Sequence, residues 1–303
     1  MRSRGVEGRK IFLERLLKGS YMPNKKHYPV QRTISIAQPS GPAANIGVLF
    51  APRLLSQVNH RLYRDSRTYD CSVTIDGNVA DATTVDVYAL ADTWYLKGAL
   101  KLAKMAWDES NAEEIAMNNG RVARWSDFRV TDGIAGASDL RAVQFDNTTL
   151  NPNQFTIGDF ELSLVVDQAG TGRNFTLGTP NSAQYSIFDE YNKQPGTSSD
   201  PEFPSDGPYT GLLPNLEVAA AVAISERGNE PPYDQTGYSS AIWVKVGTLH
   251  LASGRQRLST GFFTAPMGLI ALTGIGTIGD SADMQVTVKG GDYKGVMSNS
   301  MLE

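Results

Sequence analysis

Apolar and polar residues alternate along several short stretches of the chain, a pattern typical of half-buried β-strands. Every second position is apolar in residues 68–75 and 83–90: Tyr69, Cys71, Val73 and Ile75 in the first stretch, Val85, Val87 and Ala89 in the second. Side chains two positions apart lie on the same face of a strand, so each stretch predicts a strand with one buried face. The two stretches lie on either side of Asp76-Gly77-Asn78, and we predict that they are neighbouring antiparallel strands.

Further strands are predicted where similar apolar runs recur between turn-forming residues. They cover Trp125–Val130, Phe160–Val166, Gln184–Phe188, Val218–Ser225, Ile242–Leu251, Leu269–Leu272 and Met284–Val288. Proline and glycine recur through Tyr191–Tyr209 and predict a long loop there. These patterns favour an all-β chain, a single eight-stranded antiparallel jelly roll with long loops and one or two inserted helices.

One stretch shows a helical period instead. Its apolar positions recur three or four residues apart and comprise Leu96, Ala99, Leu100, Ala103 and Trp107, with lysines on the opposite face. Asp92 or Thr93 can cap its first turn. We therefore predict a helix over Asp92–Met117, inserted on the flank of the β domain.

Charge is distributed unevenly along the chain. The net charge is −4, yet residues 1–34 contain nine Lys or Arg against Glu7 and Glu14, a balance of +7. A basic segment beside an acidic body indicates a polyanionic partner. We predict a basic N-terminal arm over residues 1–44 and a jelly-roll domain over residues 45–303. The predicted nucleic-acid-binding residues are Arg2, Arg4, Arg9, Lys10, Arg15, Lys18, Lys25, Lys26, Arg32, Arg61 and Arg64.

Motifs for catalysis and metal binding are missing from the sequence. Cys71 is the only cysteine, the three histidines are far apart, and no HExxH, CxxC, GxSxG or phosphate-binding-loop motif occurs. Residues 274–279 match GxGxxG, but the strand expected at Met284–Val288 occupies the place where a dinucleotide site needs a helix. We expect no enzyme activity, no catalytic residues, no cofactor and no metal. We also expect neither a signal peptide nor a membrane-spanning helix.

Several blocks of sequence resemble capsid proteins of small circular single-stranded DNA viruses from environmental, mostly marine, samples. These blocks occur in the same order as in that group: Val58–Arg64, Val85–Leu90 followed by Thr93–Tyr95, Ala123–Arg129, Arg227–Asp234 and Thr260–Leu269. The resemblance implies a jelly-roll subunit that assembles into an icosahedral shell, with the basic arm inside. One departure is that the arm is only moderately basic and contains apolar residues, whereas such proteins often begin with a dense arginine-rich tract.

The expected partners are therefore other copies of the chain, about 60 or a multiple of that number, and a viral genome of single-stranded DNA. The expected location is the virion, and the host nucleus or cytoplasm during assembly. A host receptor is expected but not identified. Two other hypotheses stay open: a carbohydrate- or receptor-binding β-sandwich module of a virus or phage, and a jelly-roll hydrolase with a carboxylate pair facing a cleft.

Overall fold

The computed structural model describes residues 29–37, 46–79, 83–117, 120, 125–155, 163–166, 170–192, 242–252, 254–275 and 282–303. The chain divides into two compact units, Met1–Val30 and Gln31–Glu303. The second unit begins earlier than the shell domain expected from residue 45, and its first strand, β1 (Thr33–Ile36), already belongs to a sheet. The strand expected at Val218–Ser225 lies outside the described residues.

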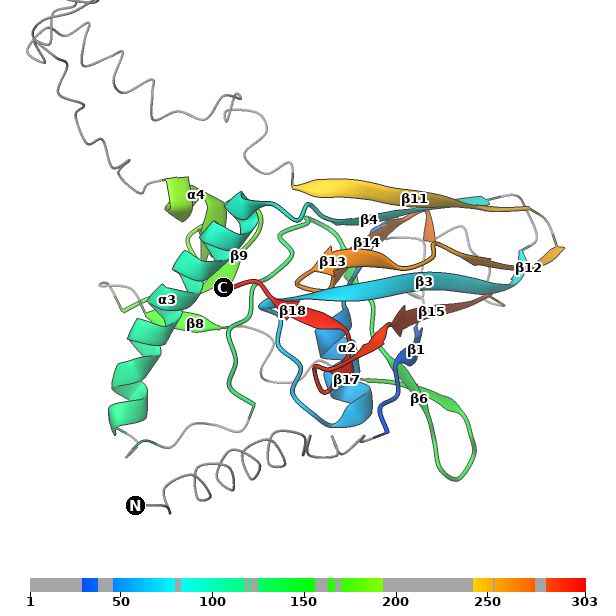
Figure 1. The fold of residues 1–303 in the computed structure, drawn as a ribbon, viewed down its shortest axis with the longest axis horizontal. Coiled ribbons are helices and arrows are strands. Elements are labelled where there is room, and N and C mark those ends of the chain that lie inside the picture. The colour runs from blue at the N-terminus through cyan, green and yellow to red at the C-terminus, as the bar shows by residue number, and fades with distance from the viewer. Residues whose placement is uncertain are drawn as a thin grey trace, which may run out of the picture. The chain divides into compact units, whose positions relative to one another are not determined.

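Two mainly antiparallel sheets form the body of the second unit and lie one above the other in Figure 1. The first sheet has the order β1, β15 (Ala282–Val288), β3 (Arg67–Val79) and β12 (Gly254–Ser259), and β13 (Phe263–Pro266) and β18 (Ser298–Ser300) also pair with β3. The second sheet has the order β11 (Trp243–Leu251), β4 (Thr83–Leu90), β14 (Leu269–Thr273), β2 (Ile46–Phe50) and β5 (Ser138–Asp139). Only the short contact between β2 and β5 in these two sheets is parallel. The described chain is therefore mainly β, as the alternation predicts.

Alternating side chains explain how the two sheets form a core. The predicted apolar face of β3 is fully buried, with Tyr69, Cys71, Val73 and Ile75 each at 0% exposure. In the second sheet, β2 and β14 are buried on both faces. Leu49 and Ile270 alternate along their strands with Val48 and Leu269, and only the latter pair belongs to the apolar cluster that includes helix α3 (Trp94–Met117).

Most residues of this apolar cluster come from a long insertion between β4 and β11. The first and last residues of the insertion meet beside the second sheet, where the Ala91 N–H donates to the Ile242 carbonyl (2.8 Å). Figure 1 shows α3 to one side of the sheets, beside a small sheet and helix α4. The bounds are α4 (Ile187–Asn192), β6 (Val143–Phe145), β7 (Pro152–Gln154), β8 (Leu164–Val166), β9 (Gly172–Thr176) and β10 (Gln184–Ser186). Outside the insertion, α2 (Ala51–Asn59) joins β2 to β3, and β16 (Gly290–Gly291) pairs with β17 (Gly295–Val296).

The predicted helix is confirmed over Trp94–Met117. Thr93 is the capping residue, because its Oγ1 accepts a hydrogen bond from the Leu96 N–H (3.2 Å). Asp92 instead forms an ion pair with Lys97 (2.8 Å). The predicted apolar stripe faces the core, since Leu96 and Leu100 are completely buried.

Several predicted strands need correction. The stretches at 68–75 and 83–90 are strands, but they belong to different sheets, and Asp76-Gly77-Asn78 continues β3 opposite β12 instead of forming a turn. Trp125–Val130 is not a strand, because its backbone is held by other partners: the Arg129 N–H donates to Ser163 Oγ (2.8 Å). The strand expected at Gln184–Phe188 stops at Ser186, where α4 begins. Only the last part of the strand expected at Phe160–Val166 lies among the described residues, as β8.

Candidate nucleic-acid interface

Of the eleven residues predicted to bind nucleic acid, three lie in the described part of the chain: Arg32, Arg61 and Arg64. The other eight lie outside the described residues: Arg2, Arg4, Arg9, Lys10, Arg15, Lys18, Lys25 and Lys26. Gln31 and Arg32 mark the point where the chain enters the second unit.

Gln31, the first residue of the second unit, is fixed to the end of α2. The Gln31 N–H donates to Asn59 Oδ1 (2.9 Å), and Asn59 Nδ2 donates back to the Gln31 carbonyl (3.0 Å). The next residue, Arg32, accepts a hydrogen bond from the Val288 N–H through its carbonyl (2.9 Å). Its guanidinium lies against Gly290, where a Cβ would be 1.9 Å from it. The chain therefore enters the second unit between the end of α2 and β16.

The end of α2 directs the following basic residues. His60 adopts a left-handed conformation (φ 49°), and its N–H caps the helix by donating to the Ser56 carbonyl. Ser56 Oγ then accepts from the Tyr63 N–H (2.9 Å), so the chain turns sharply. This turn places Arg61 and Arg64 next to the C-terminal hairpin formed by β16 and β17.

Four cations meet at this hairpin, and we refer to Arg61, Arg64, Arg67 and Lys294 as the basic cluster. Burial lowers the pKa of Lys294, and the nearby charges of Arg61, Arg64 and Arg67 lower it further. Lys294 also donates to the Leu62 carbonyl, and Arg67 holds Ser298 through Oγ (3.0 Å) and the carbonyl (2.8 Å). The side chain of Arg64 is 57% exposed, so the cluster is open to solvent at this residue.

Two tyrosines, Tyr63 and Tyr293, contact the basic cluster. The Tyr293 ring lies 4.0 Å from the Arg67 guanidinium carbon and 5.3 Å from Lys294 Nζ, both suitable for cation–π attraction. Tyr63 is completely buried and donates from its hydroxyl to the Lys294 carbonyl (3.0 Å). These contacts keep the like charges of Arg67 and Lys294 close together.

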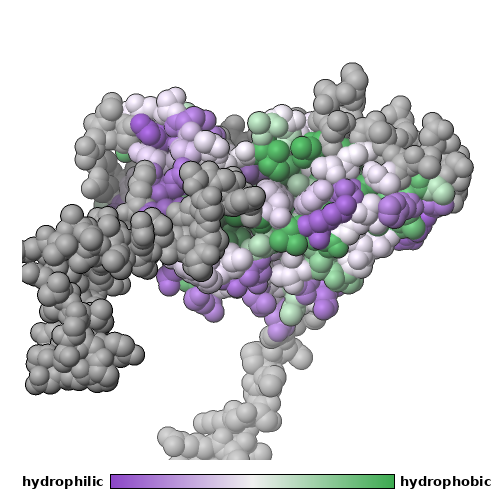
Figure 2. Space-filling model, turned by 90° about the horizontal axis from the view of Figure 1, so that it is seen from above, coloured by the Kyte–Doolittle hydropathy of each residue, from purple (hydrophilic) through white to green (hydrophobic). Residues whose placement is uncertain are grey.

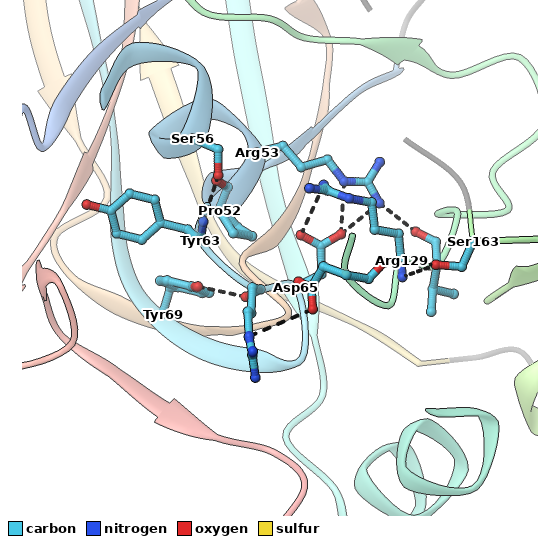
Figure 3. Close-up of polar contacts among 11 residues, drawn as sticks. Pro52, Arg53, Ser56, Tyr63, Asp65, Tyr69, Arg129 and Ser163 are labelled. Atoms are coloured by element: carbon cyan, nitrogen blue, oxygen red, sulfur yellow. Dashed lines mark hydrogen bonds and ion pairs between the residues drawn. The ribbon is translucent and has the colours of Figure 1, made fainter. Parts of the chain in front are cut away.

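A buried ion cluster lies behind the basic cluster and is shown in Figure 3. Asp65, only 1% exposed, accepts from Arg53 Nε (2.9 Å) and lies 3.8 Å from Arg129 NH1. Arg53 comes from α2 and Arg129 from the insertion, so the carboxylate joins two segments distant in sequence. Arg53 also donates to the Val130 carbonyl (2.8 Å). This cluster is structural, since both arginines are largely buried.

Asp127 lies between the buried ion cluster and the basic cluster. Its Oδ1 is 3.8 Å from Arg64 Nε, and its side chain is only 7% exposed. Its Oδ2 has no hydrogen-bond donor among the described residues. Burial raises the pKa of Asp127 to about 6, and the negative charge of Asp65 adds to this effect.

The outer face of β11 differs from this region. Figure 2 shows it as a mixture of green apolar and purple polar areas. Val244 and Lys245 are both exposed there, and Lys245 forms an ion pair with Asp86 of β4 (2.8 Å).

An apolar pocket lies inside the insertion, between α3 and the small sheet, with a volume of about 480 Å³. Its lining is mostly apolar and includes Ala103, Ala106, Val166 and Phe175, and Glu190 is the carboxylate that the described residues contribute to it.

Exposed aromatic residues are also found in the insertion. Trp94 is 72% exposed at the start of α3, with its ring centroid 6.4 Å from Tyr191 and 6.0 Å from Tyr95. Tyr191 is half-buried within its own chain.

The sequence identified Arg61 and Arg64 but not Lys294. Arg67 lies in the same basic stretch, so charge alone could have indicated it. Lys294 follows Arg64 by 230 positions, and only the pairing of β18 and β15 with β3 brings it near. No sequence signal could have joined it to the other cations.

The described residues contain no group of three or more His, Cys, Asp and Glu side chains able to hold a metal ion. None of the helices in the described ranges is long and apolar enough to cross a membrane. Comparisons with models of known protein families, with curated protein sequences and with solved structures found no match.

Proposed function

We propose that this chain is the shell subunit of a small non-enveloped virus, which packages a single-stranded DNA genome through its basic N-terminal segment. The observation that carries the proposal is the place where this segment joins the body. Gln31 is fixed to Asn59, two residues before the first cation of the basic cluster. The segment precedes Gln31 in the chain, and we propose that its charges and those of the basic cluster act on the same packaged phosphates. The basic residues would contact phosphates without reading bases.

We further propose that the two sheets form a jelly roll. Taking β12 and β13 as one interrupted strand and leaving aside the short strands β5 and β18, the two sheets contain eight strands in chain order: β1, β2, β3, β4, β11, β12/β13, β14 and β15. The first sheet then has the order 1-8-3-6 and the second 2-7-4-5. Strand 1 pairs with 8, 2 with 7, 3 with 6 and 4 with 5, all antiparallel. This is the arrangement obtained when one long antiparallel ribbon is rolled into two sheets.

Self-assembly is supported by large apolar side chains that stay exposed on the single chain. Among the described residues they include Leu164 (62%) and Val166 (66%) on β8, which pairs only with β9 in its sheet. Apolar side chains on such an edge strand favour burial against another subunit. In a closed shell of about 60 copies, residues 1–67, with a balance of +10, would supply on the order of 600 positive charges to the packaged genome.

The experiment is electron microscopy of the purified chain, together with the absorbance ratio at 260 and 280 nm of gradient-purified particles. We expect uniform closed particles that contain nucleic acid. A chain without residues 1–20 should still assemble but should carry less nucleic acid. A matched variant replaces only the six cations of that segment (Arg2, Arg4, Arg9, Lys10, Arg15 and Lys18) with glutamine and keeps its apolar residues.

The outcomes separate charge from apolar docking. If charge holds the genome, both variants lose nucleic acid equally. If the segment only docks on a neighbouring subunit, the glutamine variant keeps the absorbance ratio of the unmodified chain and only the deletion impairs assembly. A chain that stays monomeric over a wide range of salt and concentration contradicts the shell proposal itself.

A second function, binding of carbohydrate on a receptor, is favoured by one observation. The exposed Trp94 ring lies beside Tyr191 and Tyr95, and Tyr95 donates from its hydroxyl to Asn192 Oδ1 (2.9 Å). A flat aromatic ring flanked by amide and hydroxyl groups suits the apolar face of a sugar ring. A glycan array with the unmodified chain and with Trp94→Ala tests this function: it requires binding that the substitution removes.

A further inference from the structure

Asp127 differs from the other acids of the basic region, because it is buried and yet faces a half-exposed arginine. Arg64 lies 3.8 Å away, and its side chain is 57% exposed. When Asp127 is ionised, part of the charge of Arg64 is neutralised inside the protein. When Asp127 is protonated, the guanidinium is free to turn toward solvent and toward Arg61, Arg67 and Lys294.

We propose that the Arg64–Asp127 pair makes phosphate binding at the basic cluster dependent on pH, with tighter binding to single-stranded nucleic acid in acid than at neutral pH. This inference rests on the proposed function, since it describes the regulation of the same cationic site. It goes beyond that function because it assigns control of the site to a carboxylate behind it.

The surroundings of Asp127 explain why its carboxylate takes up a proton more readily than an exposed one. Its Oδ2 has no donor within the described part of the chain, and the backbone hydrogen bond from Phe128 favours the ionised form less than burial opposes it. The charged groups facing it are Asp65, which opposes ionisation, and Arg64 and Arg129, which favour it. The charge of Asp127 also acts to raise the pKa of Tyr293 and of Lys294 in the C-terminal hairpin. With burial as the largest effect, the pKa of Asp127 is about 6, between mildly acidic and neutral conditions.

The sign follows from charge. Protonation of Asp127 removes one negative charge from beside the basic cluster, so a phosphate meets one more uncompensated cation. Binding is reciprocal: a bound phosphate must favour protonation of Asp127 by the same free energy. For a half-exposed arginine we expect a gain in affinity of about three- to fivefold, the size of one screened ion pair.

The test measures binding of the full chain to an oligothymidylate labelled with a pH-insensitive dye, by fluorescence anisotropy at about pH 5 and about pH 7.5. Thymine and the phosphodiester have no group that titrates in this range, so the change comes from the protein. We expect the unmodified chain to bind about three- to fivefold more tightly at the lower pH. The slope of log K against log salt should steepen by about 0.7, the value of one phosphate contact on a single strand.

Two variants give opposite results if the proposal is right. Asp127→Asn keeps the shape of the side chain without its charge, and should bind tightly at both pH values. Arg64→Gln removes the released cation, and should bind weakly at both. His60→Asn is the matched control, because it removes the imidazole next to Arg61 in the sequence without changing the Arg64–Asp127 pair, and asparagine tolerates the left-handed conformation of that residue. It should keep the pH response of the unmodified chain.

Each contrary result has a clear meaning. If Asp127→Asn or Arg64→Gln keeps the full pH response, or if His60→Asn loses it, another group is responsible and the inference is overturned. If the unmodified chain binds equally well at both pH values, the inference falls while the proposed function stands. If it binds at neither pH value, the nucleic-acid role of the basic cluster falls and this inference with it.

Discussion

Asn59 holds both backbone polar groups of Gln31: its side-chain amide accepts from the Gln31 N–H (2.9 Å) and donates to the Gln31 carbonyl (3.0 Å). The two residues are 28 positions apart. The contact fixes the direction in which the chain enters β1, and the basic segment before Gln31 is attached at this point. It is formed by a single side chain and can be removed by a single substitution.

Replacing Asn59 with alanine should therefore loosen the start of the second unit. We expect a loss of about 1 kcal/mol in the free energy of unfolding, since the hydrogen bonds involved are exposed. The sharper effect is local: hydrogen exchange at residues 31–36 should accelerate. Gln144→Ala is the control, because Gln144 donates to the neighbouring Val58 carbonyl (3.3 Å) without contacting Gln31. Equal exchange rates at residues 31–36 in both variants would contradict the role of Asn59.

Asp65 should be the most sensitive acidic residue of the described chain. Replacing it with asparagine leaves Arg53 and Arg129 buried without a countercharge, and we expect a loss of about 3–5 kcal/mol in the free energy of unfolding. Urea denaturation measures this loss. Asp76→Asn is the control, because Asp76 pairs with Arg257 at 3.9 Å on the surface and should change stability by less than about 1 kcal/mol. Similar losses in the two variants would show that the burial of Asp65 has no energetic importance.

Asp127 should make stability depend on pH in the opposite sense to an ordinary paired acid. Its pKa is raised from 3.8 to about 6, so folding favours the protonated form. Its stabilising contribution is complete below about pH 4, falls as the pH rises toward 6, and is absent above that. Asp127→Asn does not titrate and lacks this loss.

The stability of Asp127→Asn relative to the unmodified chain should thus rise by about 3 kcal/mol between about pH 4 and pH 7. Urea denaturation of both proteins at several pH values measures the difference. The other acids titrate in both proteins and cancel to a first approximation. A difference that stays constant with pH, or that falls as the pH rises, contradicts the prediction.

The cap of α3 gives a prediction that is independent of charge. Thr93→Ala leaves the Leu96 N–H without its acceptor and should lower the free energy of unfolding by about 1 kcal/mol. Thr93→Ser keeps a hydroxyl oxygen and should retain most of the stability. Thermal melts of the two variants measure the difference, and a serine variant as unstable as the alanine variant would argue against capping by the hydroxyl.

Local patterns in the sequence predicted individual elements well. The alternation around Val73 and Val87 and the helical period around Leu100 identified a strand, a second strand and a helix with the right buried faces. Pairing was predicted less well, because alternation shows that a strand has an apolar face but not which sheet contains it. The two strands near Asp76 illustrate this: they are adjacent in sequence and lie in different sheets.

The segment around Phe128 shows a second limit. Phe128 and Val130 are buried apolar residues, which suggested a strand. The backbone here is instead bonded to side chains, to Ser163 at the Arg129 N–H and to Arg53 at the Val130 carbonyl, and the Arg129 side chain points to Asp65. A buried arginine is stable only with its countercharge, and nothing near position 129 in the sequence indicates that Asp65 supplies it. The same reasoning applies to Lys294, whose cationic neighbours lie near the other end of the chain.

The hydrogen bond between Ala91 and Ile242 has a consequence for engineering. β4 and β11 are paired along their length and the insertion begins and ends at this contact, so the register of these two strands does not need the 150 residues between Ala91 and Ile242, although those residues also supply β5 to the second sheet and Arg129 to Asp65. A short turn could replace that segment and leave a β4–β11 hairpin. The shortened chain would expose Val48, Phe50, Leu269 and Ala271, which now face the insertion core. A foreign domain could therefore be inserted between Ala91 and Ile242, provided that it brings its own apolar surface to cover this face.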